Sequence, residues 1–231
     1  MRYPVYLQSV HSGRTMAHVL DLPGCMAQGG TPEEALKRVP AAIAEVLDWL
    51  RRYGEAAPPE DEPIAVEVAE HNVSTVREEG TIGFFDVERL PVTDEDIATF
   101  LRLINYSRRE LLSLAEDLPT EALTWQPDEK SWSIERILRH VASAEHWYLT
   151  RLFGTGVLPR LKPTRTVWDR LQAVRALAVE RLSNLSDEDR RKVVVRNSER
   201  WSARKVMRRF LEHEREHMGH IREVLEKNRR R

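Results

Sequence analysis

Residues 202–227 read SARKVMRRFLEHEREHMGHIREVLEK, and this stretch decides the fold of the second half of the chain. Ser202 is of a residue type that caps helix N-termini. Apolar residues then recur among the charged ones at helical spacing: Phe210, Ile221 and Val224. His213 and His217 stand four residues apart, with His220 about one turn further on, so the three fall on one stripe of the predicted helix. Two imidazoles on one helix face are able to hold a single divalent metal ion.

Three earlier stretches show the same periodicity. The first helix is predicted from the cap residue Thr93 to about Leu118, and the second from Ile134 to Phe153 behind the N-cap Ser133. The third is predicted over 166–184. Together with the helix over 202–227, four helices of roughly 20 residues predict a four-helix bundle.

The bundle allows a ligand from a second helix to join the pair. His140 lies on the predicted second helix, and facing helices of a bundle bring side chains into one inward-facing site. The sequence therefore predicts a three-histidine metal site of His140, His213 and His217 with open positions for water. His220 is either a fourth ligand or a hydrogen-bond donor beside the site.

The second half resembles the DinB/YfiT-like family of metal-binding bundles over about residues 94–228. The residues that carry the resemblance are Trp132-Ser133-Ile134, Ile137-Leu138-Arg139-His140-Val141-Ala142, Glu145, Trp147-Tyr148-Leu149 and His213-x-x-x-His217-x-Gly219. The resemblance implies that His140, His213 and His217 bind a divalent metal, and that the chain forms a homodimer. Two positions depart from the family pattern: Glu216 replaces a usual histidine, and His220 replaces a usual glutamine.

The predicted site suits two reaction types. Neutral imidazoles leave Zn²⁺, Ni²⁺ or Fe²⁺ with its full charge, so a bound water becomes a nucleophile near neutral pH, or a bound thiolate is activated. The resemblance implies a hydrolase or a thiol S-transferase. The sequence offers no convincing general base, so the catalytic residues stay unassigned, and no organic cofactor is predicted.

An alternative interpretation comes from the motif itself. Residues 213–217 also satisfy H-E-x-x-H, the zincin protease signature, with Glu214 as general base. The metzincin extension fails, because it needs a glycine where His220 stands and a histidine where Glu223 stands. Only 14 residues follow His217, too few for a distant third ligand. The zincin interpretation is therefore disfavoured.

The first half predicts an α+β unit. The candidate strands are Tyr3–Val10, Thr15–Leu20, Ile64–Val68 and Thr81–Val87. Leu22–Cys25 and Gly29-Gly30 are predicted loops, and the capping box Thr31-x-x-Glu34 opens a helix.

This half resembles the HicB-like antitoxin domains over about residues 1–75. The residues that carry the resemblance are Leu22-Pro23-Gly24-Cys25, Ala27, Gly29-Gly30, Thr31 and Glu33-Glu34-Ala35. It implies a β-β-α-β fold and a binding module that engages a protein partner. The predicted domains are therefore a HicB-like unit at residues 1–91 and the DinB-like bundle at residues 92–231. The alternative functions are a regulatory binding protein whose bundle is structural, and a metal-stabilised homodimer without catalysis.

The composition of the chain limits the classes of protein to which it could belong. The chain has 231 residues, 32% charged and 41% hydrophobic, with a net charge of −1. No apolar run approaches the roughly 18 residues that span a membrane, and the N-terminus is not signal-like, so a cytoplasmic location is expected. The single cysteine, Cys25, excludes an intramolecular disulfide and a cysteine-based zinc cluster. The basic stretches Arg208-Arg209 and Lys227–Arg231 suit a helix and its C-terminal end, so nucleic-acid binding is not predicted.

Overall fold

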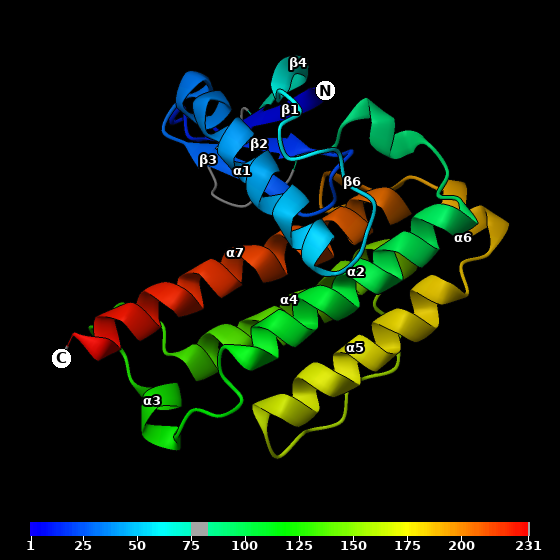
Figure 1. The fold of residues 1–231 in the computed structure, drawn as a ribbon. Coiled ribbons are helices and arrows are strands. Elements are labelled where there is room, and N and C mark those ends of the chain that lie inside the picture. Colours follow the sequence, from blue (N-terminus) through cyan, green and yellow to red (C-terminus); the bar gives the residue numbers. More distant parts are fainter. Residues whose placement is uncertain (75–82, 231) are drawn as a thin grey trace. The chain divides into compact units, whose positions relative to one another are not determined.

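The computed structural model describes residues 1–74 and 83–230. These divide into two compact units (Figure 1). The first comprises Met1–Leu90 with Val195–Arg200, and the second comprises Pro91–Val194 with Trp201–Arg231. Among the described residues, no helix combines the length and apolarity needed to cross a membrane.

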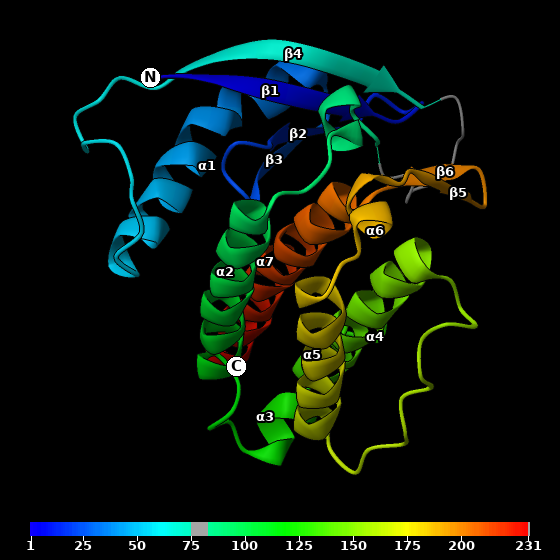
Figure 2. The same ribbon diagram turned by 90° about the vertical axis from the view of Figure 1, so that its right-hand side faces the viewer.

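The first unit is a four-stranded sheet with one long helix on its face (Figure 2). Its elements are β1 (Arg2–Ser9), β2 (Thr15–Val19), β3 (Cys25–Gly29), α1 (Pro32–Arg52), β4 (Ala65–Val73) and the 3₁₀ helix η1 (Asp86–Arg89). The strand order is β3-β2-β1-β4, with β1–β2 and β2–β3 antiparallel and β1–β4 parallel. A parallel pair needs a crossover, and in this unit the connection from β1 to β4 includes α1.

Helix α1 begins where its capping residues predict. The Thr31 hydroxyl accepts a hydrogen bond from the Glu34 backbone N–H, and the Glu34 carboxylate accepts one from Gly30 N–H at 2.8 Å. The first bond satisfies a backbone donor that the first turn of a helix leaves open, and the second fixes the residue before the cap. The face buried against the sheet consists of apolar residues: Ala35, Val39, Ile43, Val46, Leu47, Trp49 and Leu50.

Two predictions for this unit were wrong. Residues 25–29 form the strand β3, paired antiparallel with β2, so the predicted β-β-α-β order lacked one strand. The predicted strand over 81–87 is absent where the structure describes it, because 83–85 are not in a strand and Asp86–Arg89 is 3₁₀ helix. Its first two residues, 81 and 82, lie outside the described residues.

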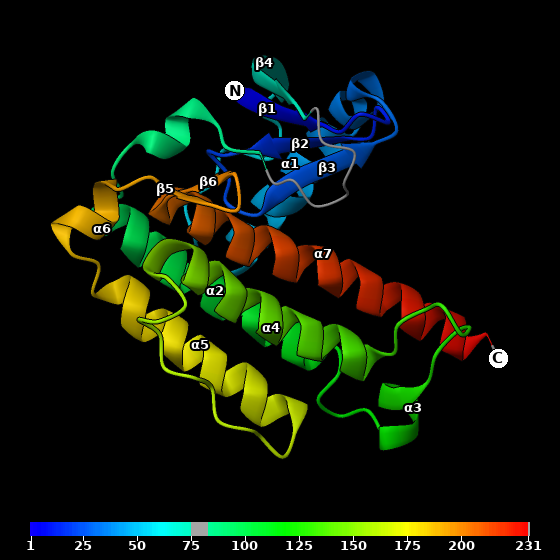
Figure 3. The same cartoon turned by 180° about the vertical axis from the view of Figure 1, so that it is seen from behind.

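The second unit is a bundle of four long helices (Figure 3). Its elements are α2 (Asp94–Ser113), α3 (Thr120–Thr124), α4 (Ile134–Phe153), α5 (Val167–Ser183), α6 (Asp187–Arg191) and α7 (Ala203–Arg229). The short hairpin β5 (Val194–Arg196) and β6 (Glu199–Trp201) precedes α7 along the chain, and its residues Val195–Arg200 belong to the first unit. Helix α4 packs against α5 and α7, and α2 packs against α7. The four predicted helices are present, and α4 begins and ends at the predicted residues. Helix α2 ends at Ser113, so its predicted end near Leu118 was wrong, because residues 114–117 form a turn.

The bundle helices start at hydroxyl caps and share one apolar core. Thr93, Ser133, Thr166 and Ser202 each accept a hydrogen bond from a backbone N–H of the first turn. The core is built from fully buried aliphatic residues: Leu111, Ile134, Ile137, Leu138, Val141, Leu171, Val174, Ile221 and Val224. Burial of these side chains fixes which face of each helix turns inward, and hence which face carries the histidines.

Candidate metal centre

Three histidine side chains from two helices meet in the second unit. His140 comes from α4, and His213 and His217 come from α7. The Nε2 atom of His213 lies 3.0 Å from Nε2 of His140 and 3.1 Å from Nε2 of His217. One ligand atom from each residue lies within 4.8 Å of the others. The structure thus brings together the three residues predicted as ligands.

These separations suit a single ion. Two nitrogens that each bind one metal at about 2.1 Å lie about 3.0 Å apart at a right angle and about 3.4 Å apart at a tetrahedral angle. Hydrogen bonds between the imidazoles account for this arrangement less well than a bound ion does. A neutral imidazole nitrogen offers either one proton or one lone pair, whereas Nε2 of His213 faces two other Nε2 atoms. A cation that accepts all three lone pairs removes the conflict.

The surroundings keep the imidazoles neutral. Burial, the other imidazoles and the Arg209 guanidinium lower the pKa of His213 to about 2. Burial, the neighbouring histidines and Arg209 lower the pKa of His217 to about 3. Burial also lowers the pKa of His140, partly opposed by the Glu216 carboxylate. Neutral imidazoles have a free lone pair, which is the form that binds metal.

Aromatic rings hold the histidines on two sides. The Trp132 ring lies edge-on to His140 at 4.9 Å and nearly parallel to His217 at 6.3 Å. The buried Tyr148 ring stands edge-on to His213 at 5.7 Å. Packing of this kind restricts ring rotation, so the nitrogens stay directed at one point.

Two other histidines lie outside the group. The His220 ring is 6.0 Å from the ring of His217 and packs against Trp132, and no ligand atom of His220 joins the group. His146 is the second of these. Its ring is half-buried, and its Nε2 atom is shielded from solvent.

The glutamate of the H-E-x-x-H motif does not point toward the place where the three histidine side chains meet. The Glu214 side chain is 1% exposed and pairs with Arg108 and Arg175. Burial raises the pKa of its carboxyl, but the two guanidinium charges outweigh burial and hold the pKa below its usual value. A carboxylate committed to two arginines is a poor general base, so the zincin interpretation loses its catalytic residue.

Sequence reasoning missed these arginines. Glu145, which the sequence analysis used only as a carrier of the family resemblance, pairs with both of them. A signal was present, because Arg108 occupies the inward stripe of α2 between Ile104 and Leu111. A charged residue on an apolar stripe predicts a buried partner of opposite charge.

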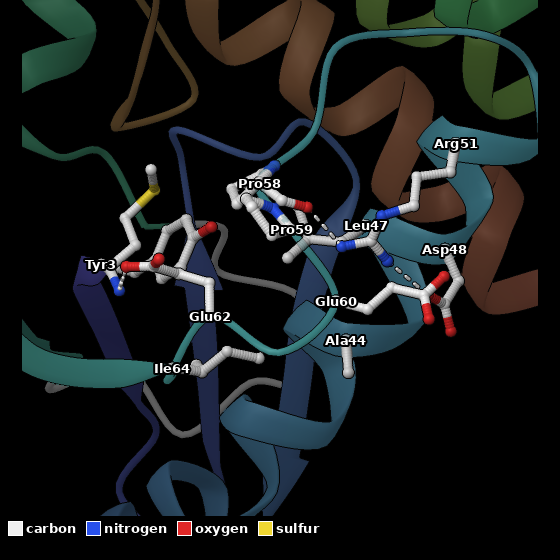
Figure 4. A pocket seen from close by; sticks show the side chains of 11 residues that line it. Tyr3, Ala44, Leu47, Asp48, Arg51, Pro58, Pro59, Glu60, Glu62 and Ile64 are labelled. Atoms are coloured by element: carbon white, nitrogen blue, oxygen red, sulfur yellow. Dashed lines mark hydrogen bonds and ion pairs between the residues drawn. The ribbon is translucent and has the colours of Figure 1, made fainter.

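A cavity lies elsewhere, in the first unit (Figure 4). Its volume is about 230 Å³, and its lining includes Tyr3, Leu47 and Ile64. The guanidinium on its wall, Arg51, is held by Asp48 and by the Pro58 carbonyl, each at 2.6 Å. The predicted metal ligands do not line it, so this cavity adds nothing to the three-histidine site.

Comparisons with known proteins bear on the bundle most directly. A family model described as the DinB superfamily matches residues 103–221, just over half of the chain. The UPF0150 protein Ta0767 of Thermoplasma acidophilum is 34% identical over 58 residues, which span 25% of this chain and 84% of that protein. The solved structure of YfiT from Bacillus subtilis, "a probable metal-dependent hydrolase with an unusual four-helix bundle topology", matches with a TM-score of 0.46 and 14% identity. That match covers 63% of this chain and 92% of the other.

Proposed function

The chain belongs to the DinB superfamily, and we propose on that premise that His140, His213 and His217 hold one divalent metal ion, Zn²⁺, Ni²⁺ or Fe²⁺, in an enzyme of the hydrolase or thiol S-transferase type. The observation that carries the proposal is the convergence of three Nε2 atoms at 3.0 and 3.1 Å. Imidazole ligands suit all three metals, so supply and geometry decide which is bound.

Three protein ligands favour catalysis over a purely structural role. Structural sites usually have four protein ligands, whereas catalytic sites keep a position for water or substrate. A divalent ion in such a site supplies a Lewis acid. The chain itself supplies neutral ligands near neutral pH and aromatic contacts from Trp132 and Tyr148 that restrict the histidine rings.

Elemental analysis of the purified protein tests the site. Wild type should contain about one equivalent of Zn, Ni or Fe, and His140→Ala and His217→Ala should lose it. His146→Ala is the matched control, because His146 lies on the same helix as His140 but outside the group. Full occupancy in His140→Ala, with normal helical circular dichroism, would rule out this ligand set.

A second experiment separates the two reaction types. Metal-loaded protein is assayed with activated esters and amides, and then with an electrophile and a low-molecular-weight thiol. Turnover that needs the thiol identifies a transferase, and turnover without it identifies a hydrolase. Removal of the metal by a chelator should abolish either activity, and re-addition should restore it.

A regulatory binding protein is the second candidate function, and β4 is the observation that favours it. This strand lies at the edge of the sheet, and its Val68 and Val73 side chains are 48% and 64% exposed. Edge strands with apolar side chains are templates for adding a strand from a partner. A partner that co-purifies with the full chain and is lost in Val68→Lys would support a HicB-like role, whereas partner-free protein would count against it. Sedimentation of the same sample tests the proposed homodimer, which a 26.9 kDa monomer would contradict.

A further inference from the structure

Four charged side chains are buried together inside the bundle. Arg108 belongs to α2, Glu145 to α4, Arg175 to α5 and Glu214 to α7. Their side chains are 9%, 2%, 12% and 1% exposed, in that order. Each long helix of the bundle thus contributes one member, and the formal charges of the four sum to zero. We call them the charge ring.

Each arginine of the charge ring contacts both glutamates. Arg108 donates from Nε to Glu214 Oε1 and from Nη2 to Glu145 Oε1, both at 2.6 Å. Arg175 donates from Nη2 to Glu214 Oε2 at 2.9 Å, and it also pairs with Glu145. All four carboxylate oxygens accept at least one hydrogen bond. The forked guanidinium allows each arginine to bond two carboxylates at once, and a single ammonium group does not reproduce this geometry.

Each arginine also donates a hydrogen bond to the backbone of the helix that carries the other arginine. Arg108 on α2 donates from Nη1 to the Leu171 carbonyl on α5 at 2.9 Å. Arg175 on α5 donates from Nη1 to the Ile104 carbonyl on α2. The two contacts are reciprocal, so a slide of α2 along α5 breaks both at once. This pair of helices forms a frame that holds the two glutamates.

The two glutamates stand on the two helices that carry the histidines. Glu145 follows His140 by five residues on α4, and Glu214 is next to His213 on α7. The same pair of arginines therefore bonds both α4 and α7 close to their candidate metal ligands. A shift of α4 along α7 by one ångström would stretch these hydrogen bonds and separate the two Nε2 atoms together.

Stability alone does not account for buried charges of this kind. Removing charges from water is costly, and well-packed apolar side chains of similar volume often stabilise a protein as well or better. The attested advantage of buried charge is that it fixes one register of the packed elements. Here the register that the ring fixes is the one that brings His140 to His213.

We propose that the charge ring is a positioning device that sets the α4–α7 register and thereby the geometry of the three-histidine metal site. Its four members are positioning residues, since none of them belongs to the ligand group. The proposal rests on the proposed function, because it assumes that the histidines bind metal.

A fully apolar ring is the decisive variant. It combines Arg108→Met, Arg175→Met, Glu145→Leu and Glu214→Leu, so that no charge is left unpaired. The midpoint of urea unfolding should be unchanged or raised. Metal affinity, measured by titration with Co²⁺, should fall 10- to 100-fold, which is the range for losing residues that orient metal ligands. The visible absorption spectrum of bound Co²⁺ should also change, because it reports the arrangement of the ligands.

A single substitution and a control complete the test. Arg175→Lys keeps the charge but loses the fork, so it should remain folded and still bind Co²⁺ more weakly, with an altered spectrum. The control is the exposed pair on α4, where Arg139 bonds Glu135 at 2.6 Å. Replacing that pair by methionine and leucine changes charges beside His140 but should leave affinity and spectrum unchanged.

The outcomes separate the two proposals. Wild-type protein that binds no metal overturns the proposed function itself. If wild type binds Co²⁺ and Arg175→Lys or the apolar ring binds it with the same affinity and spectrum, the positioning role is wrong. Weaker binding with a changed spectrum in a folded variant supports it. If the apolar ring fails to fold, Arg175→Lys decides alone, because its charge balance is intact.

Discussion

Lowering the pH from 7.5 to 5.5 should weaken metal binding by the three histidines by at most about tenfold. The pKa of His213 is lowered to about 2 and that of His217 to about 3. A proton competes with a metal only below the pKa of the folded, metal-free protein. Both residues are therefore neutral through this pH range, and neither must lose a proton to bind. Burial lowers the pKa of His140 as well, so the ordinary histidine value of about 6.5 sets an upper limit on the protons that His140 holds in this range.

The size of the effect follows from proton counting. A histidine with an ordinary pKa of about 6.5 is about 90% protonated at pH 5.5. Three such ligands would release about 2.7 protons on binding, and affinity would fall about 1000-fold between pH 7.5 and 5.5. In this site His140 alone sets the upper limit, because the pKa values of His213 and His217 lie well below 5.5. Proton release at pH 5.5 should stay below about one, and affinity should fall by at most about tenfold.

Calorimetric titration measures both quantities. Zn²⁺ is titrated at pH 5.5 into metal-free protein in two buffers of different ionisation enthalpy, and the difference in heat gives the number of protons released. His146→Ala serves as the control, because it leaves the three ligands untouched. Release of two or more protons, or a thousandfold loss of affinity, would show that the imidazoles are not held neutral by burial.

Three further predictions concern stability. Metal-free protein should lose stability as the pH falls below 6.5, because the unfolded chain binds protons that folded His213 and His217 exclude. Each of these two histidines should lower the free energy of unfolding by up to about 1.4 kcal/mol per pH unit, and a urea midpoint that stays constant from pH 7.5 to 5.5 would contradict this. Ser133→Ala removes the N-cap of α4 and should lower the free energy of unfolding by about 1 kcal/mol, whereas an unchanged value would show that the cap is not needed. Ser198→Gly should raise stability by up to about 1 kcal/mol, because φ is 64° at Ser198 and 51° at Asn197; a lower thermal midpoint would refute strain in this turn.

The helices of the bundle were predictable because their signals are local. A hydroxyl cap such as Ser133 or Ser202 acts within three residues, and the apolar period repeats inside one helix. Helix α4 begins directly after its predicted cap and ends where Gly154 adopts a φ of 93°, a conformation open to glycine. Nothing distant is needed to place these boundaries.

The missed strands depend on distant partners or weak turn signals. Strand β3 is five residues of small and flexible side chains that end in Gly29, and its pairing with β2 is what makes it a strand. The hairpin of β5 and β6 turns through Asn197-Ser198 with positive φ at both residues. The usual sequence signal for that turn is Asn-Gly, so Asn-Ser did not reveal it.

The candidate site likewise has a part that local sequence signals predict and a part that depends on distant residues. The two histidines of α7 and the family pattern around His140 predicted the ligand set, but the charge ring joins residues 30 to 106 positions apart. Periodicity shows that Arg108 faces inward but not which glutamate it meets. Only the packing of four helices decides that, because each guanidinium has to reach two helices at once.

Helix geometry explains why one short motif serves two separate tasks. Neighbouring residues on an α-helix differ by about 100° in direction, so His213 and Glu214 cannot face the same point. His213 turns toward His140, and Glu214 turns toward Arg108 and Arg175. For Glu214 to take a proton beside the histidines, it would have to leave two buried guanidinium groups without their partner, at a cost of several kcal/mol. We therefore expect the glutamate of this H-E-x-x-H segment to position α7 for the proposed metal site and to take no part in the chemistry of that site.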